Sequence, residues 1–124
     1  MTKLAFLLVY IPAVAFADKS FTGDKAGTWD CAQDPEVSLT TSDATFTLKG
    51  ACTSISVTGD NIKLTIESIK DLVLNGNKNT ATVGKLGELT VNGNSNKVTW
   101  KAALSGKKPA VQNNGKSNGV AKAK

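Results

Sequence analysis

Acidic side chains are the main candidates for chemistry in this sequence, because most other side chains that take part in catalysis are missing. The chain has 124 residues and no His, and beyond residue 17 it also lacks Arg, Tyr and Met. Four carboxylates lie in the central part of the chain: Asp60, Glu67, Asp71 and Glu88. A glycosidase pair needs two carboxylates held roughly 5–10 Å apart across the scissile bond.

These four carboxylates do not predict a catalytic pair. We expect that they do not recur at one position of the sequence repeat described below, although Glu67 and Asp71 are close enough in sequence to approach each other. Acidic residues on short loops are far more often solvated surface charges. Without His, the chain also lacks the side chain that most often moves protons near neutral pH. We therefore expect no catalytic residues, no cofactor and no enzymatic activity.

Metal and nucleic-acid binding are also disfavoured by the composition. Calcium β-rolls use Gly-Gly-x-Gly-x-Asp turns, whereas this chain offers Gly-Asn-x-Asn, whose amide oxygens alone make a weak calcium site. The formal net charge of +5 suits a phosphate backbone. However, there is no Arg, and we expect no exposed aromatic residues on which bases would stack. We expect neither a metal site nor a nucleic-acid partner.

The two cysteines are the remaining reactive groups, and they predict a structural role. Cys31 and Cys52 both lie beyond the N-terminal segment, and two cysteines in an oxidising compartment most simply form one disulfide. A metal site with two Cys and no His is the weaker alternative. The bridge would close a loop of about twenty residues, which the chain-entropy model values at roughly 3 kcal/mol.

The first seventeen residues are typical of a secretory signal peptide. Lys3 provides positive charge, residues 4–14 are apolar, and residues 15–17 (Ala-Phe-Ala) form a small-x-small cleavage site. The apolar run is too short to span a bilayer as a helix, so an uncleaved anchor is the less favoured alternative. We expect cleavage after Ala17 and a periplasmic or secreted chain that is not an integral membrane protein.

A short sequence repeat of about seventeen residues, with one glycine per copy, organises the rest of the chain. Gly59, Gly76 and Gly93 are evenly spaced at this period, and Thr41 takes the same place before Gly59, at a spacing longer by one residue. Apolar residues recur four and two residues before this turn position: Val37 and Leu39, Ile55 and Val57, Leu72 and Leu74, Leu89 and Val91. They recur again five and seven residues after it: Phe46 and Leu48, Leu64 and Ile66, Ala81 and Val83, Val98 and Trp100. Each alternating set is typical of a half-buried strand.

This pattern predicts an all-β, single-domain parallel β-solenoid over residues 18–104, with two short strands per coil. A fixed short period indicates stacked coils, and Gly and Asn suit the turn between the strands. Stacking places equal positions about 4.8 Å apart, so Leu74 should lie between Val57 and Val91 in the core. A meander of hairpins is the alternative, but it gives no reason for a recurrence at this fixed period.

The outward positions of the repeat form polar columns. Six residues after the turn position, threonine occurs in four successive copies: Thr47, Thr65, Thr82 and Thr99. The turns also stack asparagines: Asn75 over Asn92, Asn77 over Asn94, and Asn79 over Asn96. Such ladders stabilise cross-β stacks, which is the favoured interpretation. The alternative is that the threonine column is a surface-binding face.

The two ends of the repeat are less regular. Counting one period back from Thr41 places Trp29 and Cys31 in an incomplete first coil, with Cys31 over Leu48. At the other end, residues 114–118 repeat the turn pattern five residues late. Residues 105–124 are therefore either a degenerate capping coil or a Lys-rich tail, because an open solenoid end must be protected.

A combination of these features resembles an exported bacterial family catalogued as domain of unknown function three-thousand-sixty. The match consists of two cysteines, V-x-L or V-x-V strands and Gly-x-x-Asn-x-V-x-V turns, carried by Cys31, Cys52, Gly59, Gly76-Asn77-x-Asn79 and Gly93-Asn94-x-Asn96. It covers roughly residues 29–119. The resemblance implies a short exported solenoid and supplies no catalytic residue. Thr41 in place of the first glycine, and the five-residue slip before Gly115, depart from the pattern.

The expected function is that of an exported, non-catalytic β-solenoid with a structural or weakly adhesive role at the cell envelope. The expected partner is an anionic envelope polymer or glycan, because lysines cluster near the C-terminus at positions 107, 108, 116, 122 and 124. A solvated tail is the favoured alternative for this cluster. A small secreted carbohydrate-active protein, or an ice- or surface-binding protein, is the alternative function.

Overall fold

The computed structural model describes residues 19–124, and within them the protein is entirely β-structure. The predicted signal peptide, residues 1–17, lies outside the described residues. The nine strands are β1 (Lys19–Thr22), β2 (Ala26–Asp30), β3 (Glu36–Thr40), β4 (Ala44–Thr58), β5 (Ile62–Asn75), β6 (Thr80–Asn92), β7 (Lys97–Ala103), β8 (Ala110–Asn114) and β9 (Gly119–Lys122).

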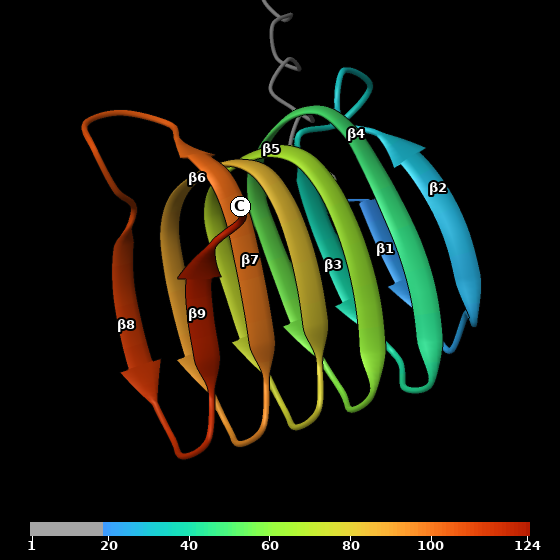
Figure 1. Ribbon diagram of the computed structural model, residues 1–124. Helices are drawn as coiled ribbons and strands as arrows, with labels where there is room; N and C mark the ends of the chain where they lie inside the picture. The colour runs from blue at the N-terminus through green and yellow to red at the C-terminus, as the bar shows by residue number, and fades with distance from the viewer. Residues whose placement is uncertain (1–18) are drawn as a thin grey trace, which may run out of the picture.

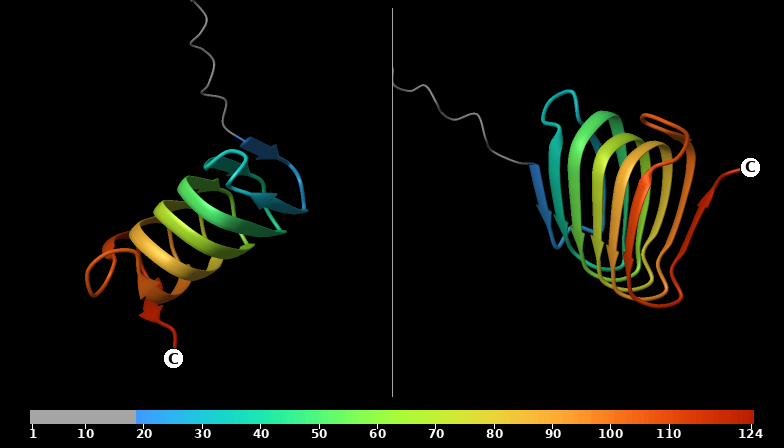
Figure 2. Two further views of the ribbon diagram at one scale, coloured as in Figure 1. Left: turned by 90° about the horizontal axis from the view of Figure 1, so that it is seen from above. Right: turned by 90° about the vertical axis from the view of Figure 1, so that its left-hand side faces the viewer.

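The strands form a parallel β-solenoid, which confirms the predicted fold class. Every strand pairing in the described structure is parallel, in the order β1-β3-β4-β5-β6-β7-β9, with β2 on β4 and β8 on β6. Figure 1 shows the coils as flattened loops with two long sides. Figure 2 shows them following one another along one axis, with β1 and β2 at one end and β8 and β9 at the other.

The strands are longer than predicted. We expected two short strands per coil, but β4, β5 and β6 have 15, 14 and 13 residues and run through the second bend without a break. The backbone hydrogen bonds between adjacent coils continue through the bend, because adjacent coils bend in the same way. The register between β4 and β5 shifts once, between Leu48 and Ala51. This shift absorbs the one additional residue that separates Thr41 from Gly59.

The core consists of columns of residues at equal coil positions. Leu74 is completely buried and lies between Val57 and Val91, as predicted. The bend adds an inward column that the sequence analysis missed, in which Cys52, Ile69 and Leu86 follow one another. The periodic spacing of Ile69 and Leu86 was the signal for this column.

The first coil differs from its predicted register. Trp29, not Cys31, pairs with Leu48, and Gly27 pairs with Phe46, so this coil is two residues longer than the repeat predicts. The reason is space, because a Cβ at Gly27 would come within 2.9 Å of the Phe46 ring. The absence of that Cβ allows Phe21 to lie against Phe46, with ring centroids 5.1 Å apart.

The C-terminal residues continue the solenoid. β8 pairs with the second half of β6, in a coil that is five residues longer than the repeat, and β9 pairs with β7. The five additional residues lie in the excursion between β7 and β8. This last coil is the most exposed part of the fold, because every residue of β8 is exposed.

The core register generates a stability prediction. Leu74→Asp places a carboxylate between Val57 and Val91, where no partner exists, and this costs several kcal/mol. A domain of this size has about 5–15 kcal/mol of stability, so we expect loss of cooperative folding by circular dichroism. The outward Thr65→Asp is the control and should fold normally. A cooperatively folded Leu74→Asp chain with an unchanged melting temperature would contradict the assigned register.

Candidate functional site

The glycines of successive turns lie one above another, and at these positions the backbones of neighbouring coils are in close contact. At Gly76 the backbone has φ 140°, and a Cβ there would overlap the carbonyl oxygen of Gly59 in the preceding coil. Only glycine combines this dihedral with this approach. Thr41, which takes the place of the first glycine, is buried, and its Oγ1 donates to the carbonyl oxygen of Asp24 at 2.8 Å.

The three predicted asparagine columns are present, but only one is a ladder of side-chain amides. Asn92 Nδ2 donates to Asn75 Oδ1 at 2.7 Å, and Asn114 Nδ2 continues this ladder by donating to Asn92 Oδ1 at 2.8 Å. In the column of Asn77 and Asn94, the side-chain oxygen instead accepts a backbone N–H one coil later. Asn94 N donates to Asn77 Oδ1 at 2.8 Å in this way.

The third asparagine column faces the core. Asn79 and Asn96 are 0% and 1% exposed. Asn96 Oδ1 accepts from the backbone N of Asn79 at 2.9 Å, and Asn96 Nδ2 donates to the carbonyl oxygen of Gly76 at 2.9 Å. Each buried asparagine thus satisfies backbone groups in the turn of the preceding coil. The fixed Gly-x-x-Asn spacing was the sequence signal for this role.

The predicted threonines form one outward column. Thr28, Thr47, Thr65, Thr82 and Thr99 are successive register partners. On one side, this column is flanked by Thr45, Lys63, Thr80 and Lys97. On the other, the adjacent outward positions hold Asp30, Lys49, Glu67, Gly84 and Lys101. We call these three columns the threonine face.

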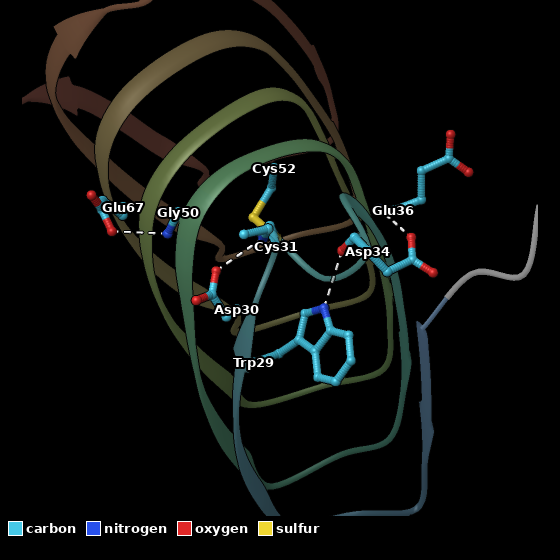
Figure 3. Close-up of a disulfide and its surroundings, with 9 residues drawn as sticks. Trp29, Asp30, Cys31, Asp34, Glu36, Gly50, Cys52 and Glu67 are labelled. Atoms are coloured by element: carbon cyan, nitrogen blue, oxygen red, sulfur yellow. Dashed lines mark hydrogen bonds between the residues drawn. A yellow bond between two sulfur atoms is a disulfide. The ribbon is translucent and has the colours of Figure 1, made fainter. Parts of the chain in front are cut away.

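A shallow groove runs across the threonine face. It has a volume of about 270 Å³, and Thr47, Thr65 and Thr82 lie along it. Gly84, which has no side chain, separates Glu67 from Lys101 in the lining. Glu67 Oε1 accepts from the backbone N of Gly50 at 2.8 Å, which orients this carboxylate (Figure 3).

The other long side of each coil has a different composition. Its outward columns, which contain Ser54, Ser56 and Thr58, are rich in Ser, Thr and Asn and include no lysine among the described residues. We call this the serine face. Its acidic residues are Glu36, Asp71 and Glu88.

One expectation about the carboxylates was wrong. Asp71 and Glu88 do share a coil position, because they are register partners on successive coils. They lie on adjacent strands of the serine face, with backbones about 4.8 Å apart. Both carboxylates therefore project from the same outward surface of the sheet. In a glycosidase pair, the two carboxylates instead lie on opposite sides of the substrate. Within residues 19–124, no group of three His, Cys, Asp or Glu side chains is arranged to hold a metal ion.

The turn edge carries the larger hollow of the two described here. It has a volume of about 600 Å³ and is lined by Ser42, Asp43, Asp60, Asn61, Asn77 and Lys78. Both carboxylates are engaged in the turns: Asp43 Oδ1 accepts from Asn61 Nδ2 at 2.8 Å, and Asp60 Oδ1 accepts from the backbone N of Asn77 at 2.8 Å. These contacts give both Asp side chains a structural role in the turn ladder.

The structure contains the predicted Cys31–Cys52 disulfide, at the start of the bend column. The Cα atoms are 5.1 Å apart, and both side chains are buried. The loop after Cys31 is held by Trp29, whose Nε1 donates to the carbonyl oxygen of Asp34 at 3.1 Å (Figure 3). The bridge therefore fastens the first coil to the second.

A family model described as "Protein of unknown function (DUF3060)" matches residues 39–81 and 68–117. Comparison with curated proteins and with solved structures gives no match. Within the described part of the chain, no helix has the length and apolar character needed to cross a membrane.

The buried asparagines generate a prediction about the turns. Asn96→Ala leaves the carbonyl of Gly76 and the N–H of Asn79 without their side-chain partner. Each unsatisfied buried group costs about 1–3 kcal/mol, so for the two groups we expect a loss of roughly 2–6 kcal/mol in the free energy of unfolding, measured with urea. Asn94→Ala, in the exposed column of the same turn, is the matched control and should cost about 1 kcal/mol. Equal losses in the two variants would refute the assigned role of the buried column.

The disulfide generates a second prediction. Cys31→Ala combined with Cys52→Ala removes a cross-link that closes a 21-residue separation, worth about 3 kcal/mol. We expect the melting temperature to fall by roughly 10–20 °C while the β-sheet circular dichroism signal is kept. Reduction of the wild-type protein should produce a similar fall. An unchanged melting temperature in the double variant would contradict this role.

Proposed function

The chain belongs to the DUF3060 family of proteins of unknown function, and we propose that it is an exported, non-catalytic adhesion module that binds anionic polymers of the cell envelope through its threonine face. The observation that carries the proposal is the uneven placement of lysine on the two long sides of the coil. The threonine face bears four lysines (Lys49, Lys63, Lys97 and Lys101) and two acidic residues (Asp30 and Glu67), a net charge of +2, whereas the outward positions of the serine face bear three acidic residues and no lysine.

This arrangement favours a repetitive anionic ligand over a small molecule. Outward positions recur at the strand spacing of about 4.8 Å, so hydroxyl and ammonium groups form rows along the axis. The groove on this face is shallow and bordered by charged side chains, unlike the enclosed apolar pockets that bind small ligands. A polymer with regularly spaced phosphates or carboxylates is complementary to such rows.

The absence of catalysis is part of the proposal. The carboxylates that lie together, Asp71 and Glu88, are on a strand surface, and Asp43 and Asp60 accept hydrogen bonds within the turns. Glu67 is oriented by Gly50, and its neighbours in its own column are Lys49 and Gly84 instead of a second carboxylate. This arrangement supports binding in preference to acid–base chemistry, which needs two positioned proton-transfer groups.

Export is supported by the N-terminal sequence and by the cross-link. The predicted signal peptide favours a location outside the cytoplasm, and the Cys31–Cys52 disulfide is compatible with that compartment. An anionic envelope polymer is then the nearest abundant partner for a lysine-bearing face.

Binding to an ice or crystal surface is the second candidate, supported by the threonine column. Thr45 and Thr47, and again Thr80 and Thr82, form pairs on the threonine face. Lys63 and Lys97 occupy the intervening coils, and their mobile charges disturb a flat, ordered surface. This candidate would be favoured if the protein shaped ice crystals but did not bind charged polymers.

The proposal is tested by removing charge from one face. Lys63→Gln combined with Lys97→Gln should weaken binding to purified lipopolysaccharide about thirtyfold at low ionic strength, because each lysine near an anionic surface contributes roughly 1 kcal/mol. The difference between this variant and the wild type should shrink as salt is raised. Isothermal titration calorimetry, with a neutral glucan as the non-ionic probe, gives the measurement.

The matched control is Lys70→Gln combined with Lys78→Gln, which removes the same charge from the bend and the turn. It should bind nearly as the wild type does, and equal weakening in both double variants would argue against a specific face. Deleting residues 105–124 is a poorer test, because β8 and β9 are part of the solenoid. Replacing Thr65 and Thr82 with Val should preserve the fold and report whether the hydroxyls contribute to binding.

A further inference from the structure

The two ends of the solenoid carry strands that are paired on one edge. At one end β1 pairs with β3 and β2 pairs with β4; at the other, β8 pairs with β6 and β9 pairs with β7. Among the described residues none of these four strands has a second partner. Such edges are templates for further strand pairing.

The ends match each other in backbone register. Because every coil is stacked in parallel on the one before it, adding one more step places β1 of a second copy on β8 and β2 of that copy on β9. Lys19 then lies opposite Val111, and Trp29 lies opposite Lys122. A parallel stack of this kind joins unlike ends, which is a heterologous contact that propagates into a filament.

The ends are also opposite in charge. Residues 19–36 contain two lysines and four acidic residues, a net charge of −2, whereas residues 104–124 contain five lysines and no acidic residue, a net charge of +5. The opposite charges attract two copies in the head-to-tail orientation and oppose stacking of two C-terminal ends. The C-terminal end is also apolar in part, since Val111 and Leu104 are 44% and 42% exposed.

A lysine nevertheless terminates one apolar column at each end. The column of Val37, Ile55, Leu72, Leu89 and Val111 begins with Lys19. The column of Trp29, Leu48, Ile66, Val83 and Trp100 finishes with Lys122. The Lys19 Nζ lies over the rings of Phe21 and Trp29, 4.8 and 4.7 Å from their centroids. The Lys122 Nζ lies 5.9 Å from the centroid of the Trp100 ring.

These lysines make stacking unfavourable. On its own aromatic ring, each ammonium has a favourable cation–π contact, and Lys122 is exposed while Lys19 is only partly buried. In a stack, the same ammonium would be enclosed between two coils, against Val111 in one case and Trp29 in the other, without a carboxylate partner. Inward-pointing charges at a strand edge are a known means of preventing edge-to-edge association.

We propose that the C-terminal end of the solenoid is complementary to the N-terminal end of a second copy, and that Lys19 and Lys122 prevent the two ends from associating in the wild-type protein. Register and charge favour the contact, and the two lysines oppose it. The chain therefore remains monomeric, although its fold is able to continue from one molecule into the next.

The test replaces both lysines with residues typical of their columns. Lys19→Val combined with Lys122→Leu, expressed from the full reading frame in an exporting bacterial host, should assemble into a series of oligomers in sedimentation velocity. We expect assembly at a concentration at least about tenfold below any at which the wild type associates. Raising the salt concentration should weaken it, because the ends carry opposite charges. Circular dichroism and thermal melting confirm that the variant is folded.

The matched control removes the same charge from loops at the same ends: from Lys25 in the first turn, whose Nζ donates to the carbonyl oxygen of Ser42 at 2.8 Å, and from Lys107 in the excursion before β8. Lys25→Val combined with Lys107→Leu should remain monomeric at those concentrations. If this control assembles as readily as the double variant, reduced net charge is the cause and the proposal is wrong. It is also wrong if the Lys19→Val, Lys122→Leu protein stays monomeric, or if the wild type assembles equally well.

The geometry of the contact is tested by cross-linking. Ser20 and Gln112 occupy the same outward column at opposite ends, so Ser20→Cys and Gln112→Cys would lie about 4.8 Å apart across a stacked interface, within disulfide range. Added to the assembling variant, they should give a ladder of disulfide-linked multimers on a non-reducing gel. If this variant forms oligomers but its two added cysteines do not become cross-linked, the head-to-tail arrangement is wrong. Because this experiment contains no polymer, its result is independent of the proposed adhesion.

Discussion

The close approach of one turn to the next is the constraint on which the rest of the structure depends. The coils stack at the strand spacing, so the carbonyl oxygen of Gly59 occupies the space where a side chain at Gly76 would begin. The turns that follow Thr41 therefore carry glycine at this position, whereas Thr41 itself lies in the second turn and donates from its Oγ1 to the carbonyl oxygen of Asp24. Once the turns are superposed, every later residue is placed above its equivalent. The apolar columns, the threonine column and the asparagine columns all follow from that superposition.

The regular part of this architecture could be predicted from the sequence because its signal is repeated. Leu74 has Val57 and Val91 at equal distances along the chain, and the periodic placement of apolar residues is enough to put it in the core. The bend column was harder to find, because Cys52, Ile69 and Leu86 follow short polar segments without local alternation. Asp71 and Glu88 were separated in the sequence analysis although one period of the repeat relates them. Each of them directly precedes a leucine of one core column, so their shared position could have been predicted from the period.

The irregular first coil was not predictable from the repeat. Its register depends on how Phe21, Gly27 and Phe46 share space, which is a packing relation between side chains and not a period. The same limit applies to the threonine face. The sequence identified Thr47, Thr65, Thr82 and Thr99, and its period also places Lys63 and Lys97 beside them. The lysine-free character of the other side became evident only when the two sides of the coil were known. The grouping of charge is a property of the folded surface.

The inward asparagines give the solenoid a direction. The turn at Gly59 obtains a hydrogen bond from Asn79, and the turn at Gly76 obtains one from Asn96, so a turn is completed only by the coil that follows it in the chain. A polypeptide that is synthesised from its N-terminus presents its coils in this same order. Each arriving coil finishes the hydrogen bonding of its predecessor and leaves its own turn incomplete. The disulfide between Cys31 and Cys52 fastens the first two coils, which also come first in the chain. The coils are therefore synthesised in the same order in which their turns become fully hydrogen-bonded. The molecule is able to fold one coil at a time, from its N-terminus toward its C-terminus.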